Sequence, residues 1–202
     1  LKSPSRLLVV DTHRVRSALS PRSEGLRAML ESADIVKVVH CCYGDASALR
    51  VEHGISLRCA FDTGIADAVL RGFNPNTSRG LGLVLVDWLK DKAIHLTHKG
   101  KLVHTPFMFN ERPLTLERFV YSAEDVEHCI DLYDVMRLRL LELGLLELVF
   151  TLSNDRCTPS KEVKPLASTV VIAIVDALSM ICIEDNNTGF LELPTSDFDT
   201  NC

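Results

Sequence analysis

The sequence lacks any long hydrophobic run. Its longest apolar stretch, residues 169–183, is about fifteen residues long and contains Asp176, whereas a helix that crosses a bilayer needs roughly twenty apolar residues. The opening run at residues 7–10 is too short for the apolar core of a signal peptide. These absences predict a chain with neither a membrane span nor a membrane partner.

The sequence also lacks the cysteine and histidine spacings of common zinc sites. Its seven cysteines form no C-x-x-C pair, and the histidines within residues 90–112 show neither H-x-x-x-H nor H-E-x-x-H spacing. An odd number of cysteines in mostly apolar surroundings is typical of reduced thiols. We therefore expect an intracellular protein, in the nucleus or the cytoplasm, without a structural zinc ion.

Excess positive charge is absent too, since the formal net charge is −5. Affinity for nucleic acid comes largely from Lys and Arg on phosphates, so the whole surface is not expected to bind nucleic acid. A nuclease is still compatible with this charge, because carboxylates that bind divalent cations lower the formal charge. One locally basic stretch, residues 90–112, contains Lys99, Lys101 and Arg112. We expect these cations either to contact phosphates or to lie in a solvated loop.

Hydrophobic patterns predict an α/β chain. Residues 6–11 and 35–39 have the composition of strands on either side of a helix around Leu26 and Leu30, which favours a parallel pair with a right-handed crossover. Apolar residues at helical spacing predict further helices at residues 45–53, 61–70, 81–89 and 114–143, the last with room for one break. Three more strands are expected at residues 169–175, 179–184 and 190–193.

Tyr121 and Asp125 are four residues apart on the long predicted helix, so their side chains leave one face one turn apart. This arrangement suits a tyrosine hydroxyl beside a carboxylate that binds a metal. On its own, however, the spacing more often describes a half-buried tyrosine next to a solvated aspartate. The surrounding residues decide between the two interpretations.

Two motifs support the metal-binding interpretation, one around Tyr121 and Asp125 and one upstream. Residues 112–126, with the sequence RPLTLERFVYSAEDV, resemble the third exonuclease motif of the ribonuclease D family, where an Arg-Pro-Leu turn leads into a helix bearing Tyr-Ala-Ala-x-Asp-Val. Here Ser122 replaces the first small residue. Residues 37–49, in which Asp45 follows His40 by five positions, resemble the second motif, and Phe-Asp-Thr follows at residues 61–63. The similarity covers about residues 7–148. Within the family, the chain resembles the branch that includes Egalitarian-type proteins.

The resemblance implies a ribonuclease H-like fold and removal of nucleotides from a single-stranded 3′ end, with RNA favoured as the substrate. In such enzymes four acidic residues hold two divalent cations about four ångströms apart, and oxygen ligands favour Mg²⁺ or Mn²⁺. By this resemblance Asp45 and Asp125 would bind metal. Tyr121 would orient the attacking water, which is the arrangement of the tyrosine-bearing (DEDDy) subclass.

The first motif of the family, Asp-x-Glu on the opening strand, has no good counterpart. Asp11 is followed two positions later by His13, where the motif requires Glu, and it lies only 34 residues before Asp45. We expect Asp11 to be structural, the first strands of the fold to lie upstream of Leu1, and the chain as given to be inactive. Asp62 is expected to cap the following helix rather than to bind metal.

The expected organisation is therefore an exonuclease-like domain at residues 1–153, incomplete at its N-terminus, then a linker at 154–168. Residues 169–202 would form a small β-rich appendage or a truncated second domain. Two alternatives to the enzyme stay open. One is a non-catalytic adaptor of the Egalitarian type that binds nucleic acid or protein, and the other is a fragment without activity whose missing strands leave an edge unpaired.

Overall fold

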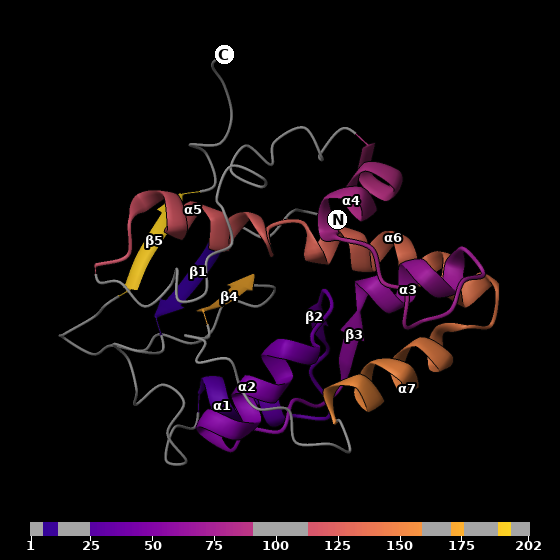
Figure 1. The fold of residues 1–202 in the computed structure, drawn as a ribbon, viewed down its shortest axis with the longest axis horizontal. Coiled ribbons are helices and arrows are strands. Elements are labelled where there is room, and N and C mark those ends of the chain that lie inside the picture. Colours follow the sequence, from indigo (N-terminus) through magenta and orange to yellow (C-terminus); the bar gives the residue numbers. More distant parts are fainter. Residues whose placement is uncertain (1–5, 12–24, 91–112, 159–170, 176–189, 195–202) are drawn as a thin grey trace.

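The computed structural model describes residues 6–11, 25–90, 113–158, 171–175 and 190–194. These residues form two small sheets. Helix α5 (Leu116–Glu124) lies beside the antiparallel sheet, and the other helices gather around the parallel one (Figure 1). In chain order the elements are β1 (Arg6–Asp11), α1 (Leu26–Glu31), β2 (Lys37–Val39), α2 (Tyr43–His53), β3 (Ala60–Asp62), α3 (Thr63–Leu70), α4 (Leu81–Leu89), α5 (Leu116–Glu124), α6 (Cys129–Glu142), α7 (Leu146–Cys157), β4 (Val171–Val175) and β5 (Phe190–Pro194).

Strands β2 and β3 form a parallel pair joined by α2, a βαβ arrangement. The register places Lys37 opposite Ala60 and Val39 opposite Asp62. Successive strand residues face opposite sides of a sheet, and here each side has its own core. Ala60 belongs to one cluster of buried residues, and the next residue, Phe61, belongs to the other.

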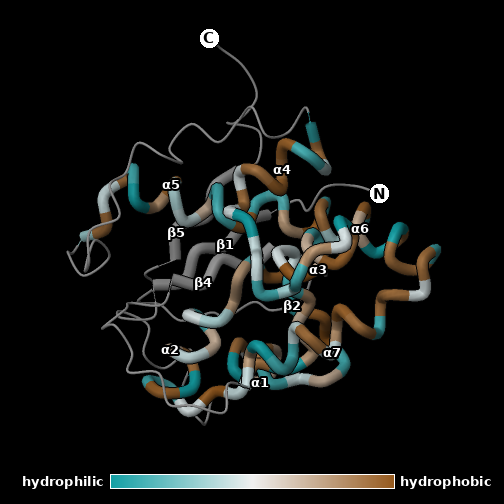
Figure 2. The backbone as a smooth tube through the Cα atoms, turned by 45° about the vertical axis from the view of Figure 1, so that its right-hand side comes forward, coloured by the Kyte–Doolittle hydropathy of each residue, from teal (hydrophilic) through white to brown (hydrophobic). Residues whose placement is uncertain are grey.

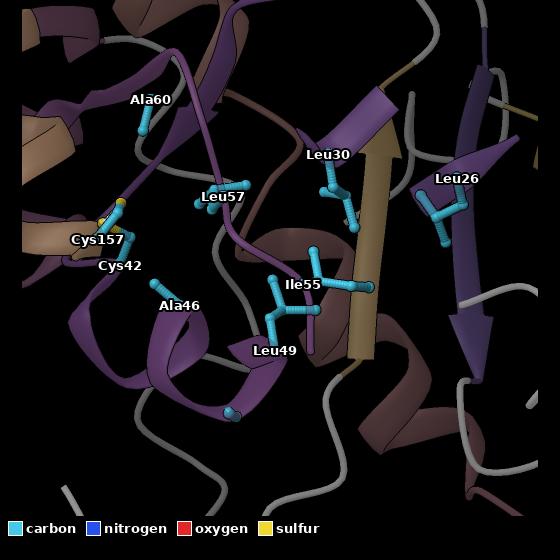
Figure 3. Close-up of a cluster of buried hydrophobic side chains, with 10 residues drawn as sticks. Leu26, Leu30, Cys42, Ala46, Leu49, Ile55, Leu57, Ala60 and Cys157 are labelled. Atoms are coloured by element: carbon cyan, nitrogen blue, oxygen red, sulfur yellow. Dashed lines mark hydrogen bonds between the residues drawn. The ribbon is translucent and has the colours of Figure 1, made fainter. Parts of the chain in front are cut away.

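The first core lies between the parallel pair, α1 and α2 (Figure 3). Its buried side chains are Leu26, Leu30, Cys42, Ala46, Ala48, Leu49, Ile55, Leu57, Ala60 and Cys157. The second core lies on the other face, among α3, α4, α6 and α7. There Phe61 makes edge-to-face contacts with Tyr133 and Phe150, with ring centroids 4.8 and 5.6 Å apart. Such pairs stabilise a core beyond their buried area.

Helix α7 covers the edge of β3 with polar side chains. The hydroxyl of Ser153 accepts the backbone N–H of Asp62 at 3.0 Å, and the side-chain oxygen of Asn154 accepts that of Ala60 at 3.2 Å. An edge strand normally leaves such donors unpaired, so α7 satisfies them in place of a further strand. This helix was not expected from the sequence, and it extends to Cys157, into residues that were expected to form a linker.

Strand β1 lies between β4 and β5 in the second sheet and pairs antiparallel with both. The predicted parallel pair of residues 6–11 with 35–39 is therefore wrong. Proximity in sequence favoured that pair, but the partners of β1 come from near the other end of the chain. The strands expected at 169–175 and 190–193 are confirmed as β4 and β5, whereas residues 179–184 lie outside the described residues.

Two other boundaries differ from expectation. Ile35 and Val36 are exposed, so β2 begins only at Lys37. Phe61 lies within strand β3 and does not start a helix, because α3 begins only at Thr63. The long helical stretch is broken once as expected, between α5 and α6, and the helix at 81–89 is confirmed as α4.

Hydrophobic residues recur along α6 and α7 (Figure 2). On α6 they include Val135, Leu138 and Leu141, which are exposed. Within the described part of the chain, no helix combines the length and the apolar character that a membrane crossing requires.

Candidate functional site

Asp45 lies in the first turn of α2, directly after the turn that leaves β2. It is exposed, yet surrounding protein desolvates its carboxyl group. This desolvation, together with the negative charges of Asp125 and Asp62, raises the pKa of Asp45 to about 6. A carboxyl group in this environment favours a nearby positive charge.

Tyr121 and Asp125 lie at the end of α5. Thr115 caps the start of this helix by accepting the backbone N–H of Arg118 at 3.3 Å, and Asp125 follows its last residue. Tyr121 is buried, and burial first, then the charges of Asp125 and Glu124, raise its pKa to about 12. The hydroxyl of Tyr121 therefore keeps its proton at neutral pH and can donate a hydrogen bond.

Asp125 contributes to the raised pKa of both Asp45 and Tyr121. The fold thus brings these three side chains within electrostatic reach of one another, although α2 and α5 are far apart in sequence. In the described part of the chain no group of three or more His, Cys, Asp and Glu side chains is arranged to hold a metal ion. Lys99, Lys101 and Arg112 lie outside the described residues.

Asp62 controls the turn that precedes α2. Its carboxylate is fully buried and accepts the backbone N–H groups of Cys41 at 2.9 Å and Cys42 at 3.2 Å. It also accepts those of Gly64 and Ile65, so the predicted N-cap of α3 is confirmed. Because Cys41 has a left-handed backbone with φ of 55°, which is uncommon outside glycine, these hydrogen bonds hold the start of α2 in place.

The space around this turn is filled. A Cβ atom added at Gly64 would lie 3.0 Å from the sulfur of Cys41 and 3.1 Å from Oδ1 of Asp62. The absence of a side chain at Gly64 therefore allows α3 to approach the turn closely.

Arg156 neutralises Asp62 from α7, with 3.2 Å between Nη1 and Oδ2. The same guanidinium donates to the hydroxyl of Ser78 and the carbonyl of Pro75. Sequence reasoning missed Arg156, because residues from 154 onward were expected to form a linker. In the structure, Val149, Ser153 and Cys157 are buried at intervals of four residues, the spacing of one helix face.

His40, directly after β2, anchors the same region. Its Nε2 donates to the backbone carbonyl of Arg79 at 2.9 Å, since a carbonyl can only accept, and its Nδ1 lies 2.8 Å from the hydroxyl of Thr63. His40 thus ties β2 to the start of α3 and to the loop before α4.

Asp67 is a second buried carboxylate that the sequence did not single out. Arg79 binds it with two nitrogens, at 2.7 and 3.0 Å, and Arg71 and the indole N–H of Trp88 complete the network. Burial alone would raise the pKa of Asp67, but the hydrogen bonds from Arg79 and Trp88 and the positive charges lower it below its usual value. The network fixes the loop between α3 and α4.

The matched family defines the class of this protein. A family model described as 3′-5′ exonuclease matches residues 1–141, which is more than half of the chain, so the chain belongs to the 3′-5′ exonuclease family. Within that class it is ribonuclease D-like, as its two motifs predicted. Ribonuclease D of Granulibacter bethesdensis is 28% identical over 153 residues, covering 74% of this chain and 35% of the relative. The chain thus spans about a third of that relative's length.

Solved structures share the fold. Brucella melitensis NrnC is 20% identical with a TM-score of 0.56, over 70% of this chain and 64% of NrnC. Trypanosoma brucei RNase D in complex with RNA U12 is 20% identical with a TM-score of 0.54, over 77% of this chain and 51% of the other. The predicted α/β fold of the ribonuclease H-like exonucleases is confirmed at this level.

Proposed function

We propose that this chain is part of a nuclease that removes nucleotides from the 3′ end of single-stranded nucleic acid, with RNA favoured. The observation that carries the proposal is the electrostatic link of Asp45 and Tyr121 to Asp125 in a member of the 3′-5′ exonuclease family. Support for the substrate comes from relatives, since structures are known of NrnC bound to pGG and of RNase D in complex with RNA U12.

The donors present suit a hard divalent cation. Asp45 and Asp125 supply carboxylate oxygens, the ligands that Mg²⁺ and Mn²⁺ prefer. Desolvation by burial, and then the charges of Asp125 and Asp62, raise the pKa of Asp45, and a bound cation would favour its charged form. A structure of NrnC with bound Mg²⁺ is known. Bound divalent cations would supply a hydroxide at neutral pH and stabilise the leaving oxygen.

The chain's own residues then have distinct roles. Asp45 and Asp125 would hold the cations, which is the metal-ligand role of the DEDDy subclass. Tyr121 keeps its proton and would orient the attacking water through its hydroxyl. Asp62 touches neither water nor substrate in this proposal, because its oxygens are occupied by backbone N–H groups and Arg156.

We further propose that these 202 residues alone hydrolyse nucleic acid very slowly. Only two of the four family carboxylates are identified, and His13 stands where the first motif has Glu. Two Mg²⁺ ions would bring about four positive charges to two negative ones, so tight binding of both is unfavourable. Tyr121 cannot replace a ligand, since orienting a water helps only after a cation has lowered the pKa of that water.

The test is release of mononucleotides from 3′-labelled single-stranded RNA and DNA in the presence of Mn²⁺. We compare the 202-residue chain with a version extended upstream to include an Asp-x-Glu strand, each with and without Asp125→Asn. The exposed Asp155→Asn is the matched control. We expect the extended chain to release mononucleotides. Asp125→Asn should abolish this release, and Asp155→Asn should preserve it. Equal release by Asp125→Asn and its parent would overturn the proposed site.

The same comparison of the 202-residue chain with the extended version also tests a second function, that of a non-catalytic adaptor. If the 202-residue chain binds single strands and the extended version shows no release, the protein is a non-catalytic adaptor. The observation that favours this alternative is the lack of a Glu two positions after Asp11. Release by the 202-residue chain itself, lost in Asp125→Asn, would instead show that another of its carboxylates completes the site.

A further inference from the structure

Cys42 and Cys157 meet in the first core although 115 residues separate them. Their sulfur atoms lie 2.9 Å apart, and Figure 3 shows the two side chains pointing toward one another. Both thiols are buried, with 0% and 3% of the residue exposed. Both are free in this structure.

Each cysteine occupies the end of a helix. Cys42 is the N-cap residue of α2, three positions before Asp45, and Cys157 is the last residue of α7. A disulfide bond is about 2.05 Å long, so the two sulfur atoms need to approach by less than about 1 Å to form one. Among the described residues no third Cys, His or carboxylate joins them in a metal-binding group.

We propose that Cys42 and Cys157 are a redox modification site: an oxidised low-molecular-weight disulfide converts them into an intramolecular disulfide that ties α7 to the start of α2. The proposal rests on this geometry and is independent of the nuclease function.

The reaction takes place in two exchanges. The thiolate of Cys157 attacks one sulfur of the small disulfide, forming a mixed disulfide and releasing one small thiolate. The thiolate of Cys42 then attacks the sulfur of Cys157 and releases the second. The two cysteine protons pass to the two small thiolates, so the protein loses two electrons and two protons, and the small disulfide gains both.

Cys157 is the first nucleophile for two reasons. The hydrogen bond from Cys42 lowers the pKa of Cys157 and raises that of Cys42, which favours the thiolate on Cys157. Cys157 also lies in the last turn of α7, next to the exposed Thr158, and last turns open more readily than helix centres. Opening this turn exposes Cys157 before Cys42.

The experiment treats the folded, reduced chain with oxidised glutathione and maps its tryptic peptides without reduction. Trypsin places Cys157 in residues 157–161 and both Cys41 and Cys42 in residues 38–50. Because Cys41 shares a peptide with Cys42, Cys41→Ser is the decisive variant. We expect the linked peptides in the parent chain and in Cys41→Ser, and their absence in Cys42→Ser, Cys42→Ala and Cys157→Ser. Cys129→Ser should leave the link intact.

Thermal unfolding gives a second readout that does not depend on nuclease activity. A disulfide that closes so long a loop should raise Tm by roughly 5 °C or more, and dithiothreitol should reverse the rise. Cys42→Ala should show no rise. A link through Cys41, a stable glutathione adduct at Cys157, or failure of the folded chain to react would each overturn the proposal.

Discussion

Arg156 donates a hydrogen bond of 3.2 Å to the fully buried carboxylate of Asp62, although 94 residues separate the two in sequence. The same carboxylate accepts the backbone N–H groups of Cys41 and Cys42. One buried anion therefore joins the end of α7, the start of α3 and the turn before α2, and so fixes the position of Asp45.

Replacing Asp62 should destabilise the chain strongly. Asp62→Ala leaves Arg156 without its charged partner and several backbone donors unpaired, and breaking a buried pair in this way costs about 3–5 kcal/mol. Urea unfolding measures the free energy of unfolding. The control Asp155→Ala, at an exposed position next to Arg156, should change it by less than about 0.5 kcal/mol. Equal losses in the two variants would contradict the role of the buried pair.

The network of Asp67 predicts sensitivity to acid. Because the folded-state pKa of Asp67 is lowered, its contribution to stability is fully present above the unfolded pKa of about 3.9 and is lost as the pH falls through the folded value. Asp67→Asn should therefore be less stable than the parent chain at neutral pH, and the difference should shrink below about pH 4. Urea unfolding across this pH range measures it, and a constant difference would exclude the linkage.

Asp45 should have the opposite effect on stability from Asp67. Its pKa is raised to about 6, so its carboxylate lowers stability progressively as the pH rises from about 4 to 6, and the loss persists above. Asp45→Asn should have a higher Tm than the parent at neutral pH and an equal one near pH 4. Millimolar Mg²⁺ should raise the Tm of the parent chain at neutral pH but not that of Asp45→Asn. A Tm unaffected by Mg²⁺ in the parent would count against a metal site here.

The basic segment gives a prediction for nucleic-acid binding. If Lys99, Lys101 and Arg112 contact phosphates, replacing all three by Gln should weaken binding to single strands of any sequence. The slope of log K against log salt should then fall by roughly 2, since each phosphate contact on a single strand contributes about 0.7. Fluorescence anisotropy at several salt concentrations measures the slope. Unchanged binding at low salt would assign the segment to solvation.

Local patterns predicted most helices and strands but not their pairing. Apolar spacing located α2, α4 and the broken helix of α5 and α6, because these helices bury one face. The pairing of β1 depends on β4 and β5, whose approach no local pattern specifies. Helix α7 was missed because its polar residues Ser153 and Asn154 serve the backbone of β3, a need that exists only in the folded chain.

Family motifs alone singled out Asp45, Tyr121 and Asp125, and their role stays a prediction. The capping role of Asp62 followed from its place before a helix and is confirmed. Arg156 and Asp67 were not found, because their importance lies in tertiary ion pairs. The paired thiols of Cys42 and Cys157 were equally invisible, since only the fold brings them together.

The polar side chains of α7 on the edge of β3 also determine where a further strand could pair with this sheet. Because side chains of α7 already occupy the outward N–H groups of Ala60 and Asp62, no incoming strand can pair there without displacing a whole helix. In the described part of the chain no strand pairs with β2 on its other side. A further strand, whether from another segment or from another molecule, could therefore join this sheet only by pairing with β2.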